Sequence, residues 1–554
     1  MGAERMVEEG GTDRGAGVWR LVLAALGVSV LTACGGGGSG SSSSTPPPLT
    51  PPAATTVPYT KGVYQPFRGL AAQCADPRIG TDPTTEKPYP DVKGSIASEN
   101  NWLRSWINDT YLWFDEVPDL DPNSSQNTLD YFDQLRTSAL TASGRDKDQF
   151  HFTYPTDTWN ALQGGVELGY GVEWVFISAV PPREVRAAYV EPGSPAANAG
   201  VQRGDMILSI DGVDAVDGGT QSDVDTLNEG LYPSAANRNH QFTLRDMANG
   251  TKSVTLQSAA ISTEPVQNVQ VLSTPSGPVG YLQFNAHNEP AEAALVEAFD
   301  TFKAAQDVAA TFDLVIDLRY NGGGLLAVAS ELAYMIAGPT HTAGQTFELT
   351  VFNSKHPSTD PITGQALEPM PFYDTAGGFS VTEGTALPTL NLPRVFILTG
   401  NNTCSASESI INSLRGVNVE VIQIGATTCG KPYGFYPADN CGTTYFAVQF
   451  KGVNAVGFGD YADGLSPANG SSSTGATVTG CMVEDDFTQA LGNTQEARLK
   501  AALDYRENGG NCPAQSAGLA QKRAQGSFVT LSGEGVMRRS PWEENRILSP
   551  RRRN

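Results

Sequence analysis

The chain has 554 residues, of which 40% are hydrophobic and 17% charged, a composition that is ordinary for globular protein and long enough for about two to four domains. Its formal net charge of -23 disfavours nucleic acid and anionic membrane surfaces as partners. The acidity otherwise concerns solubility and does not indicate a fold.

The first 34 residues have the pattern of an export signal. An apolar run of about a dozen residues, LVLAALGVSVLTAC, follows Arg20; it is too short to span a membrane but fits a signal peptide. Its last four residues, LTAC, resemble the lipobox of bacterial lipoproteins, which implies lipidation of Cys34 and anchoring in the bacterial envelope, at the outer membrane facing the periplasm or the surface. An ordinary signal peptide cut nearby is the alternative. Residues 35–60 are rich in Gly, Ser and Pro and predict a disordered tether.

The remaining cysteines favour disulfides. Their even number in an exported protein is typical of paired cysteines, and they could pair in about 15 ways. They are Cys74, Cys404, Cys429, Cys441, Cys481 and Cys512. A zinc site is the rival, but the sequence has neither a CxxC pair nor a nearby histidine cluster, so we expect no metal.

Residues 61–158 predict a small helical domain with an aromatic core. Apolar side chains recur near helical spacing in ENNWLRSWINDTYLWFDEV and TLDYFDQLRTSAL. The core candidates are Trp102, Trp106, Leu112, Leu129, Phe132 and Leu135.

Residues 159–265 predict short strands separated by turns. Within them, VEPGSPAANAGVQRGDMILSIDG is expected to form a strand, a short helix that begins at Ser194-Pro195 and ends at Gly200, and a second strand. This stretch resembles the PDZ domains of bacterial proteases, a β-sandwich-like fold with short helices that binds peptide C-termini by strand addition. The resemblance places the carboxylate-binding loop at Leu168, Gly169, Tyr170, Gly171 and Val172. A PDZ fold that only packs or gates is the alternative.

Residues 266–512 predict an α/β core. The apolar strands VGYLQF, FDLVID, RVFILTG and VEVIQIG alternate with helical patterns. The segment from 513 to 554 has no clear pattern, and we expect it to be flexible.

Two interpretations compete for Ser405, in TCSASESIINSLRG. Ser405 and Glu408 have the spacing of a capping box at a helix start. Alternatively, Ser405 is a nucleophile at the carboxyl end of a buried strand, where backbone N–H groups at the helix start could hold an oxyanion.

A nucleophilic serine needs an activating base. Lys431 follows the next strand and would emerge near Ser405 if the two strands are neighbours. A lysine base must be neutral, and lowering its pKa from about 10.4 to 7–8 costs roughly 4 kcal/mol, so it needs an apolar pocket. His287 is the best alternative base among the five histidines. Lys431 also lies in a near match to a phosphate-binding loop, but Pro432 stands where the magnesium-binding hydroxyl belongs.

Together, the PDZ stretch, DLRYNGGG, SASE and GKPYG resemble the S41 peptidases, the carboxy-terminal processing proteases, over about residues 95–512. The resemblance implies a multidomain fold with a ClpP/crotonase-like α/β core. It implies Ser405 as nucleophile and Lys431 as general base. The oxyanion hole would be the N–H of Ala406 with that of Gly323, or alternatively Gly324.

The sequence departs from this family near Lys431. The family's orienting glutamine, four residues after the lysine, is replaced by Phe435. A Cys404–Cys429 bridge would join the neighbourhoods of Ser405 and Lys431, and a Cys429–Cys441 bridge is equally compatible with the sequence.

We therefore expect a lipid-anchored serine endopeptidase with no metal or organic cofactor. Its substrates would be proteins or peptides whose free C-termini dock on the PDZ domain. The alternatives are a catalytically inactive, peptidase-like scaffold that presents its PDZ groove, and a Ser–His hydrolase that depends on His287.

Overall fold

The computed structural model describes residues 56–470, 475–513 and, for the backbone only, 545–547. Cys34, the predicted signal peptide, most of the predicted tether and, apart from Pro513 and 545–547, the C-terminal segment expected to be flexible lie outside these residues. Among the helices of the described ranges, none combines the length and apolar composition that a membrane crossing requires.

The N-terminal part is built around α1 (Ile96–Thr110), which begins where the Ser95 side chain accepts a hydrogen bond from Ser98 N–H. The other elements here are η1 (Phe67–Gly69), β1 (Gln73–Cys74), β2 (Val92–Lys93), η2 (Phe114–Glu116), α2 (Thr128–Asp133) and β3 (Phe152–Pro155). Trp102 and Trp106 stack with ring centroids 5.4 Å apart, so the predicted aromatic core is present. Leu129 is 46% exposed, however, and its assignment to that core was wrong, because α2 turns its Tyr131–Phe132 face inward and leaves Leu129 outside.

The same aromatic cluster includes side chains from far along the chain, among them Tyr433, Tyr445 and Val448. In addition, β3 pairs antiparallel with β22 (Thr443–Phe446), which follows both catalytic candidates in sequence. The N-terminal part is therefore packed onto the α/β core and does not bury its aromatic side chains alone.

The PDZ region forms a sheet of order β10-β9-β7-β6-β5, with β8 paired to β7. Its elements are α3 (Thr156–Gln163), β4 (Val166–Gly169), β5 (Val172–Ser178), β6 (Glu184–Val190), α4 (Pro195–Asn198), β7 (Met206–Ile210), β8 (Val213–Asp214), α5 (Gln221–Leu231), β9 (Asn239–Arg245), β10 (Thr251–Gln257) and β11 (Ala259–Ser262). As predicted, the short helix starts at Ser194-Pro195, where the Ser194 hydroxyl accepts from Ala197 N–H at 3.1 Å. β5 lies at the edge of this sheet.

The core is a six-stranded sheet of order β12-β13-β14-β18-β19-β26, in which β13 through β26 run parallel. Its strands and helices are β12 (Val266–Leu272), β13 (Val279–Phe284), α6 (Ala291–Gln306), β14 (Asp313–Asp317), α7 (Leu326–Thr342), β18 (Arg394–Thr399), α8 (Ala406–Gly416), β19 (Glu420–Gly425), β26 (Gly480–Met482) and α9 (Ala497–Glu507). The smaller strands around it are β15 (Gly323–Leu325), β16 (Thr346–Phe352), β17 (Met370–Pro371), β20 (Tyr433–Gly434), β21 (Ala438–Asn440), β23 (Phe450–Val453), β24 (Leu465–Pro467), β25 (Ala476–Val478) and β27 (Asn545–Ile547).

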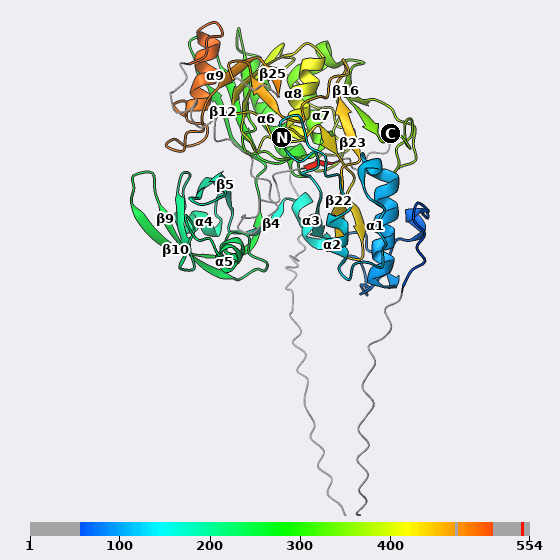
Figure 1. Cartoon of the computed structure of the whole chain (residues 1–554). Coiled ribbons are helices and arrows are strands. Elements are labelled where there is room, and N and C mark those ends of the chain that lie inside the picture. Colours follow the sequence, from blue (N-terminus) through cyan, green and yellow to red (C-terminus); the bar gives the residue numbers. More distant parts are fainter. Residues whose placement is uncertain (1–55, 471–474, 514–544, 548–554) are drawn as a thin grey trace, which may run out of the picture. The chain divides into compact units, whose positions relative to one another are not determined.

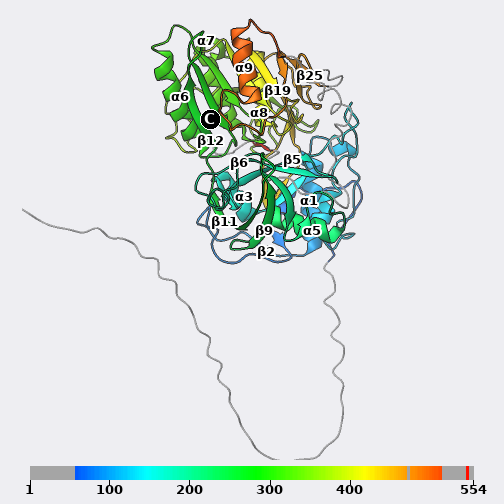
Figure 2. The same ribbon diagram turned by 90° about the vertical axis from the view of Figure 1, so that its left-hand side faces the viewer.

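Alternation along the core strands explains why helices cover both faces of the sheet (Figure 1, Figure 2). β14 directs Leu314 and Ile316 into the cluster formed with α6, α7 and α8. It directs Val315 into a second cluster, formed with α9. Successive side chains of a strand point to opposite faces, so a continuous apolar run is what a sheet buried on both sides requires.

Three disulfides join all six cysteines that the described residues contain. Cys74 pairs with Cys441, Cys404 with Cys429, and Cys481 with Cys512. The Cys429–Cys441 alternative is therefore wrong, since Cys441 lies beside the N-terminal part and takes Cys74 as its partner.

Candidate active site

The catalytic candidates converge because three neighbouring parallel strands end at one edge of the core sheet. β14 leads into the glycine loop, β18 into Ser405, and β19 toward Lys431. β14 pairs with β18, and β18 pairs with β19. The carboxyl ends of parallel strands are where α/β sheets place their sites.

Ser405 has an unusual backbone conformation. Its φ of 60° and ψ of -114° lie in a region that L-residues rarely adopt, immediately before α8. The predicted capping box with Glu408 is present, with Ser405 N–H donating to the Glu408 carboxylate at 2.9 Å. The Ser405 side chain is fully buried, however, and its Oγ has no partner at hydrogen-bond geometry among the described residues. A strained residue with an unpaired buried hydroxyl is costly as a mere helix cap, and such strain is concentrated at functional sites.

Glu408 organises the backbone around both candidates. One carboxylate oxygen accepts from Ser405 N–H at 2.9 Å and from Lys431 N–H at 2.8 Å. The other accepts from Gly430 N–H at 2.9 Å and from the Thr428 hydroxyl. Burial raises the pKa of the Glu408 carboxyl, and these hydrogen bonds oppose that rise. The sequence indicated Glu408 only as a capping partner; its link to the Lys431 loop was missed.

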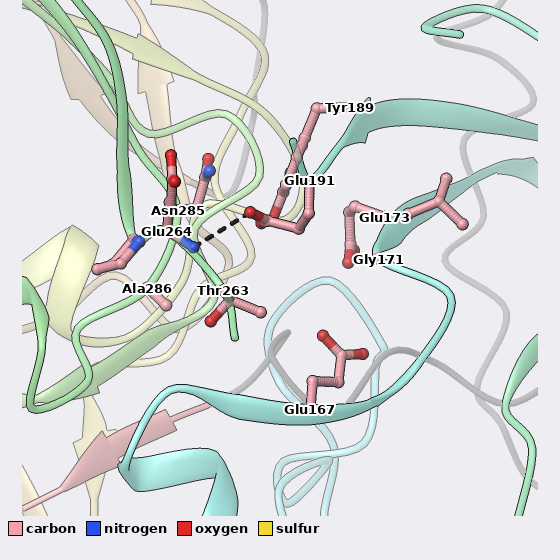
Figure 3. A pocket seen from close by; sticks show the side chains of 11 residues that line it. Glu167, Gly171, Glu173, Tyr189, Glu191, Thr263, Glu264, Asn285 and Ala286 are labelled. Atoms are coloured by element: carbon pink, nitrogen blue, oxygen red, sulfur yellow. Dashed lines mark hydrogen bonds between the residues drawn. The ribbon is translucent and has the colours of Figure 1, made fainter. Parts of the chain in front are cut away.

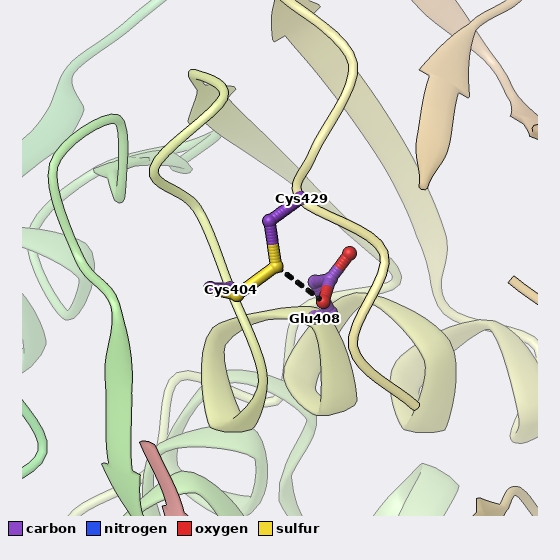
Figure 4. Close-up of side chains that lie close together, drawn as sticks. All are labelled: Cys404, Glu408 and Cys429. Carbon is purple, nitrogen blue, oxygen red and sulfur yellow. Dashed lines mark hydrogen bonds between the residues drawn. A yellow bond between two sulfur atoms is a disulfide. The ribbon is translucent and has the colours of Figure 1, made fainter. Parts of the chain in front are cut away.

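A disulfide between Cys404 and Cys429 also links the Ser405 turn to the Lys431 loop (Figure 4). Cys404 and Cys429 have Cα atoms 5.2 Å apart, and the bridge joins the residue before Ser405 to the loop that carries Lys431. Glu408 lies against it, with a carboxylate oxygen 3.5 Å from Cys429 Sγ. Disulfide sulfurs carry neither a proton nor a thiolate charge, so this is a packing contact and the three residues do not form a metal-binding set.

Lys431 is fully buried among aromatic rings. Its Nζ lies 4.6 Å from the ring centroids of both Phe150 and Phe435, and 6.0 Å from that of Phe152. Phe435 thus forms one wall at the position where the family has its orienting glutamine. Phe150 and Phe152 come from the N-terminal part, and no pattern in the sequence indicates that they reach Lys431.

Asn321 ties the glycine loop to the Ser405 turn. Its backbone carbonyl accepts from Cys404 N–H at 3.1 Å and from the Ser407 hydroxyl at 3.1 Å. Its side-chain oxygen accepts from Gly323 N–H at 2.9 Å. One asparagine therefore fixes the loop relative to the start of α8.

Gly323 and Gly324 follow with φ of 104° and 136°, the conformations for which this loop needs glycine. A Cβ on Gly324 would lie 2.4 Å from the His287 carbonyl oxygen, so this position is also sterically closed to other residues. Gly323 N–H is engaged by Asn321, as described above, whereas His287 N–H donates to the Gly323 carbonyl and Leu325 N–H to the His287 carbonyl.

His287 packs behind this loop. Its Nδ1 lies 3.0 Å from the Asn321 side-chain oxygen, and burial lowers its pKa to about 3. A base with so low a pKa is poorly matched to proton abstraction near neutral pH. The geometry therefore favours a role for His287 in holding the loop over the role of base.

Of the predicted PDZ loop, Tyr170 and Gly171 form the turn between β4 and β5, whereas Leu168 and Gly169 end β4 and Val172 begins β5. Leu168 and Gly169 pair with β11, and Gly171 carbonyl accepts from Glu191 N–H at 2.8 Å. Tyr170 is buried and donates its hydroxyl hydrogen to the Gly230 carbonyl of α5 at 2.9 Å. The loop therefore lies between the edge strand β5 and the C-terminal end of α5.

Gly171 and Val172 of this loop also border a pocket that is lined on its other side by residues 263–265 and 285–286 (Figure 3). Its acidic lining comprises Glu167, Glu173, Glu191 and Glu264, and no residue of α5 contributes to it. Glu191 accepts from Glu264 N–H and from Gln267 Nε2, both at 3.1 Å, but burial dominates and raises the pKa of its carboxyl to about 7.

Arg203, in the loop after α4, connects the PDZ region to the glycine loop. Its guanidinium donates to Asp485 at 2.7 Å and to the Tyr320 hydroxyl oxygen at 2.6 Å, and Tyr320 immediately precedes Asn321. The Tyr320 hydroxyl in turn donates to Asp485 at 2.5 Å.

Three protein-family models match the chain: peptidase family S41 over residues 278–435, the PDZ domain over 186–228, and the peptidase S41 N-terminal domain over 98–154. The chloroplastic C-terminal processing peptidase of Tetradesmus obliquus is 32% identical over 156 residues, which cover 26% of this chain and 32% of that protein. The carboxyl-terminal-processing protease of Picosynechococcus sp. is 27% identical over 208 residues, which cover 35% of this chain and 44% of that protein. The matches thus span less than half the length of either relative.

Among solved structures, a crystal structure from Bacteroides fragilis assigned to the S41 proteases superposes with a TM-score of 0.53 at 22% identity, covering 76% of this chain and 99% of that chain. At this identity the likeness concerns the fold. It agrees with the predicted combination of an α/β peptidase core and a PDZ domain.

Proposed function

We propose that this protein is a serine endopeptidase with Ser405 as nucleophile and Lys431 as general base. The chain carries an S41 peptidase core, an S41 N-terminal domain and a PDZ domain, and it is homologous to the C-terminal processing proteases. The observation that carries the proposal is the state of Ser405. It combines a strained backbone, a buried Oγ without a hydrogen-bond partner among the described residues, and a backbone linked through Glu408 to Lys431.

In the proposed reaction, Ser405 Oγ attacks the scissile carbonyl while Lys431 takes the serine proton. Lys431 then returns that proton to the leaving amine, and water hydrolyses the acyl-enzyme. The N–H of Ala406, with that of Gly323 or Gly324, holds the oxyanion. In the conformation described here Gly323 N–H donates to the Asn321 side chain, and it must leave that oxygen to do so.

The PDZ domain is proposed to hold the substrate's C-terminus. β5 is an edge strand of its sheet and therefore a site for strand addition, and the residues Leu168–Val172 at its start would receive the terminal carboxylate. The export signal and Cys34 lipidation suggested by the sequence would place the protein in the bacterial envelope, where it would process other exported proteins.

Cleavage of an unfolded protein with a free apolar C-terminus tests the proposal. The parent should cleave it, and both Ser405→Ala and Lys431→Met should abolish cleavage while leaving the circular dichroism spectrum unchanged. His287→Gln should retain more activity than Lys431→Met. If the parent does not cleave, while a peptide with a free C-terminus still binds its PDZ domain, the inactive scaffold is the better account.

A further inference from the structure

A short strand from the end of the chain lies at the candidate active site. β27 pairs in parallel with β15, with Asn545 opposite Gly323 and Ile547 opposite Leu325. β27 also contacts β20 and α8. Because α8 starts directly after Ser405 and β20 starts two residues after Lys431, this strand (the short red segment in Figure 1) lies among the elements that carry every catalytic candidate.

The hydrogen bonds on one edge of β15 show which main-chain groups face β27 on the other edge. There, His287 N–H donates to the Gly323 carbonyl and Leu325 N–H donates to the His287 carbonyl. Peptide groups of successive residues in a strand point to opposite sides, so the N–H and C=O of Gly324 point toward β27. This edge presents main-chain groups that an added strand can satisfy, whatever its sequence.

The segment that supplies β27 is suited to be a tethered occupant. Only 31 residues separate Pro513 from Asn545, and tethering of this kind gives an effective concentration on the order of millimolar. Residues 514–554 carry eight Lys or Arg and three Glu, whereas the whole chain has 36 basic and 59 acidic residues. A basic segment on an acidic protein is attracted to its own chain rather than repelled by it.

We propose that the edge of β15 is the strand-addition site for extended peptides in the catalytic groove, and that residues 545–547 are its built-in occupant, which substrates must displace. The inference deepens the proposed function, since it assigns the place of the substrate backbone and an internal competitor for it. A displaced segment exposes the site, and the apparent affinity for substrate peptides rises in proportion to the open fraction.

Binding can be tested apart from catalysis, in full-length Ser405→Ala protein. The probe is a fluorescein-labelled peptide of residues 540–552 with an amidated C-terminus, so that a PDZ carboxylate site cannot hold it. Binding by the Ser405→Ala chain is compared with binding by the same chain with Asn545→Pro, Arg546→Pro and Ile547→Pro. A matched control carries three prolines instead at Gln525, Gly526 and Ser527, outside the paired strand.

We expect the 545–547 proline variant to bind the probe at least tenfold more tightly than either the Ser405→Ala chain or the control. A probe N-methylated at the amides of 545, 546 and 547 should bind it at least tenfold more weakly, because the strand then lacks its donors. Equal affinity for all three proteins, or equal binding of the N-methylated probe, would overturn the proposal. A protein that shows the expected binding but never cleaves with Ser405 intact would refute the peptidase function and leave this binding site in place.

Discussion

Replacing Ser405 should make the protein more stable while abolishing cleavage. The buried Oγ without a partner among the described residues costs about 1–3 kcal/mol, and Ser405→Ala removes it while keeping the hydrogen bond from Ser405 N–H to Glu408. Ser405→Gly also relieves the positive-φ strain, worth about 1–2 kcal/mol, against about 0.5–1 kcal/mol for the added freedom of the unfolded chain. We expect Ser405→Ala to gain about 1–3 kcal/mol in the free energy of unfolding and Ser405→Gly about 1–4 kcal/mol.

Urea unfolding of the parent and the two variants measures this gain. Ser407→Ala is the matched control, since its buried hydroxyl donates to the Asn321 carbonyl at 3.1 Å and its removal should cost about 1 kcal/mol. If Ser405→Ala is instead as destabilising as Ser407→Ala, then Ser405 Oγ has a structural partner and the strained-nucleophile argument fails.

Three further predictions concern the surroundings of the site. Between pH 5 and 7 the folded protein keeps a proton on Glu191 that the unfolded chain has lost, so the free energy of unfolding should fall by at most about 3 kcal/mol as the pH rises. Glu191→Gln should remove this fall when urea unfolding is measured at pH 5 and pH 8. If the parent and the variant show the same pH dependence, burial does not hold the proton on Glu191. Replacing Cys404 and Cys429 by serine should lower the free energy of unfolding by about 3 kcal/mol and abolish most of the activity. The bridge between Cys481 and Cys512 closes a loop of similar length, so replacing those two cysteines by serine should cost similar stability but spare activity. Equal losses of activity would argue against the Cys404–Cys429 bridge as a catalytic constraint. Arg203→Met should lower kcat/KM about tenfold, because Tyr320 loses a hydrogen-bond partner next to the glycine loop. Lys252→Met, which breaks the ion pair with Asp205 inside the PDZ region, should have little effect on kcat/KM. A larger loss with Lys252→Met than with Arg203→Met would refute the link from Arg203 to the glycine loop.

The parts of the site that lie close to apolar strands could be predicted from the sequence. The run before Ser405 is continuous and apolar and the run before Lys431 is mostly apolar, as expected for parallel strands buried on both faces, and such strands bring their carboxyl ends together. The helix at Ser194-Pro195 was likewise predictable, because Ser before Pro is a local capping signal.

Contacts between distant segments could not be predicted in this way. Phe150 reaches Lys431 across 281 positions of the sequence, and Cys74 pairs with Cys441 at a separation of 367. Neither residue has a local pattern that specifies its partner. β27 is a more extreme case, because main-chain hydrogen bonds place it and almost any sequence can supply them.

The most direct test of the account is kcat/KM for one peptide substrate with Ser405→Ala, Lys431→Met and the double variant, measured beside the parent. Residues that act as one catalytic unit are strongly non-additive, so each single variant should fall to the same floor and the double variant should fall no further. If Lys431→Met keeps activity within tenfold of the parent, or if the double variant falls by the product of the two single effects, Ser405 and Lys431 do not work as a dyad.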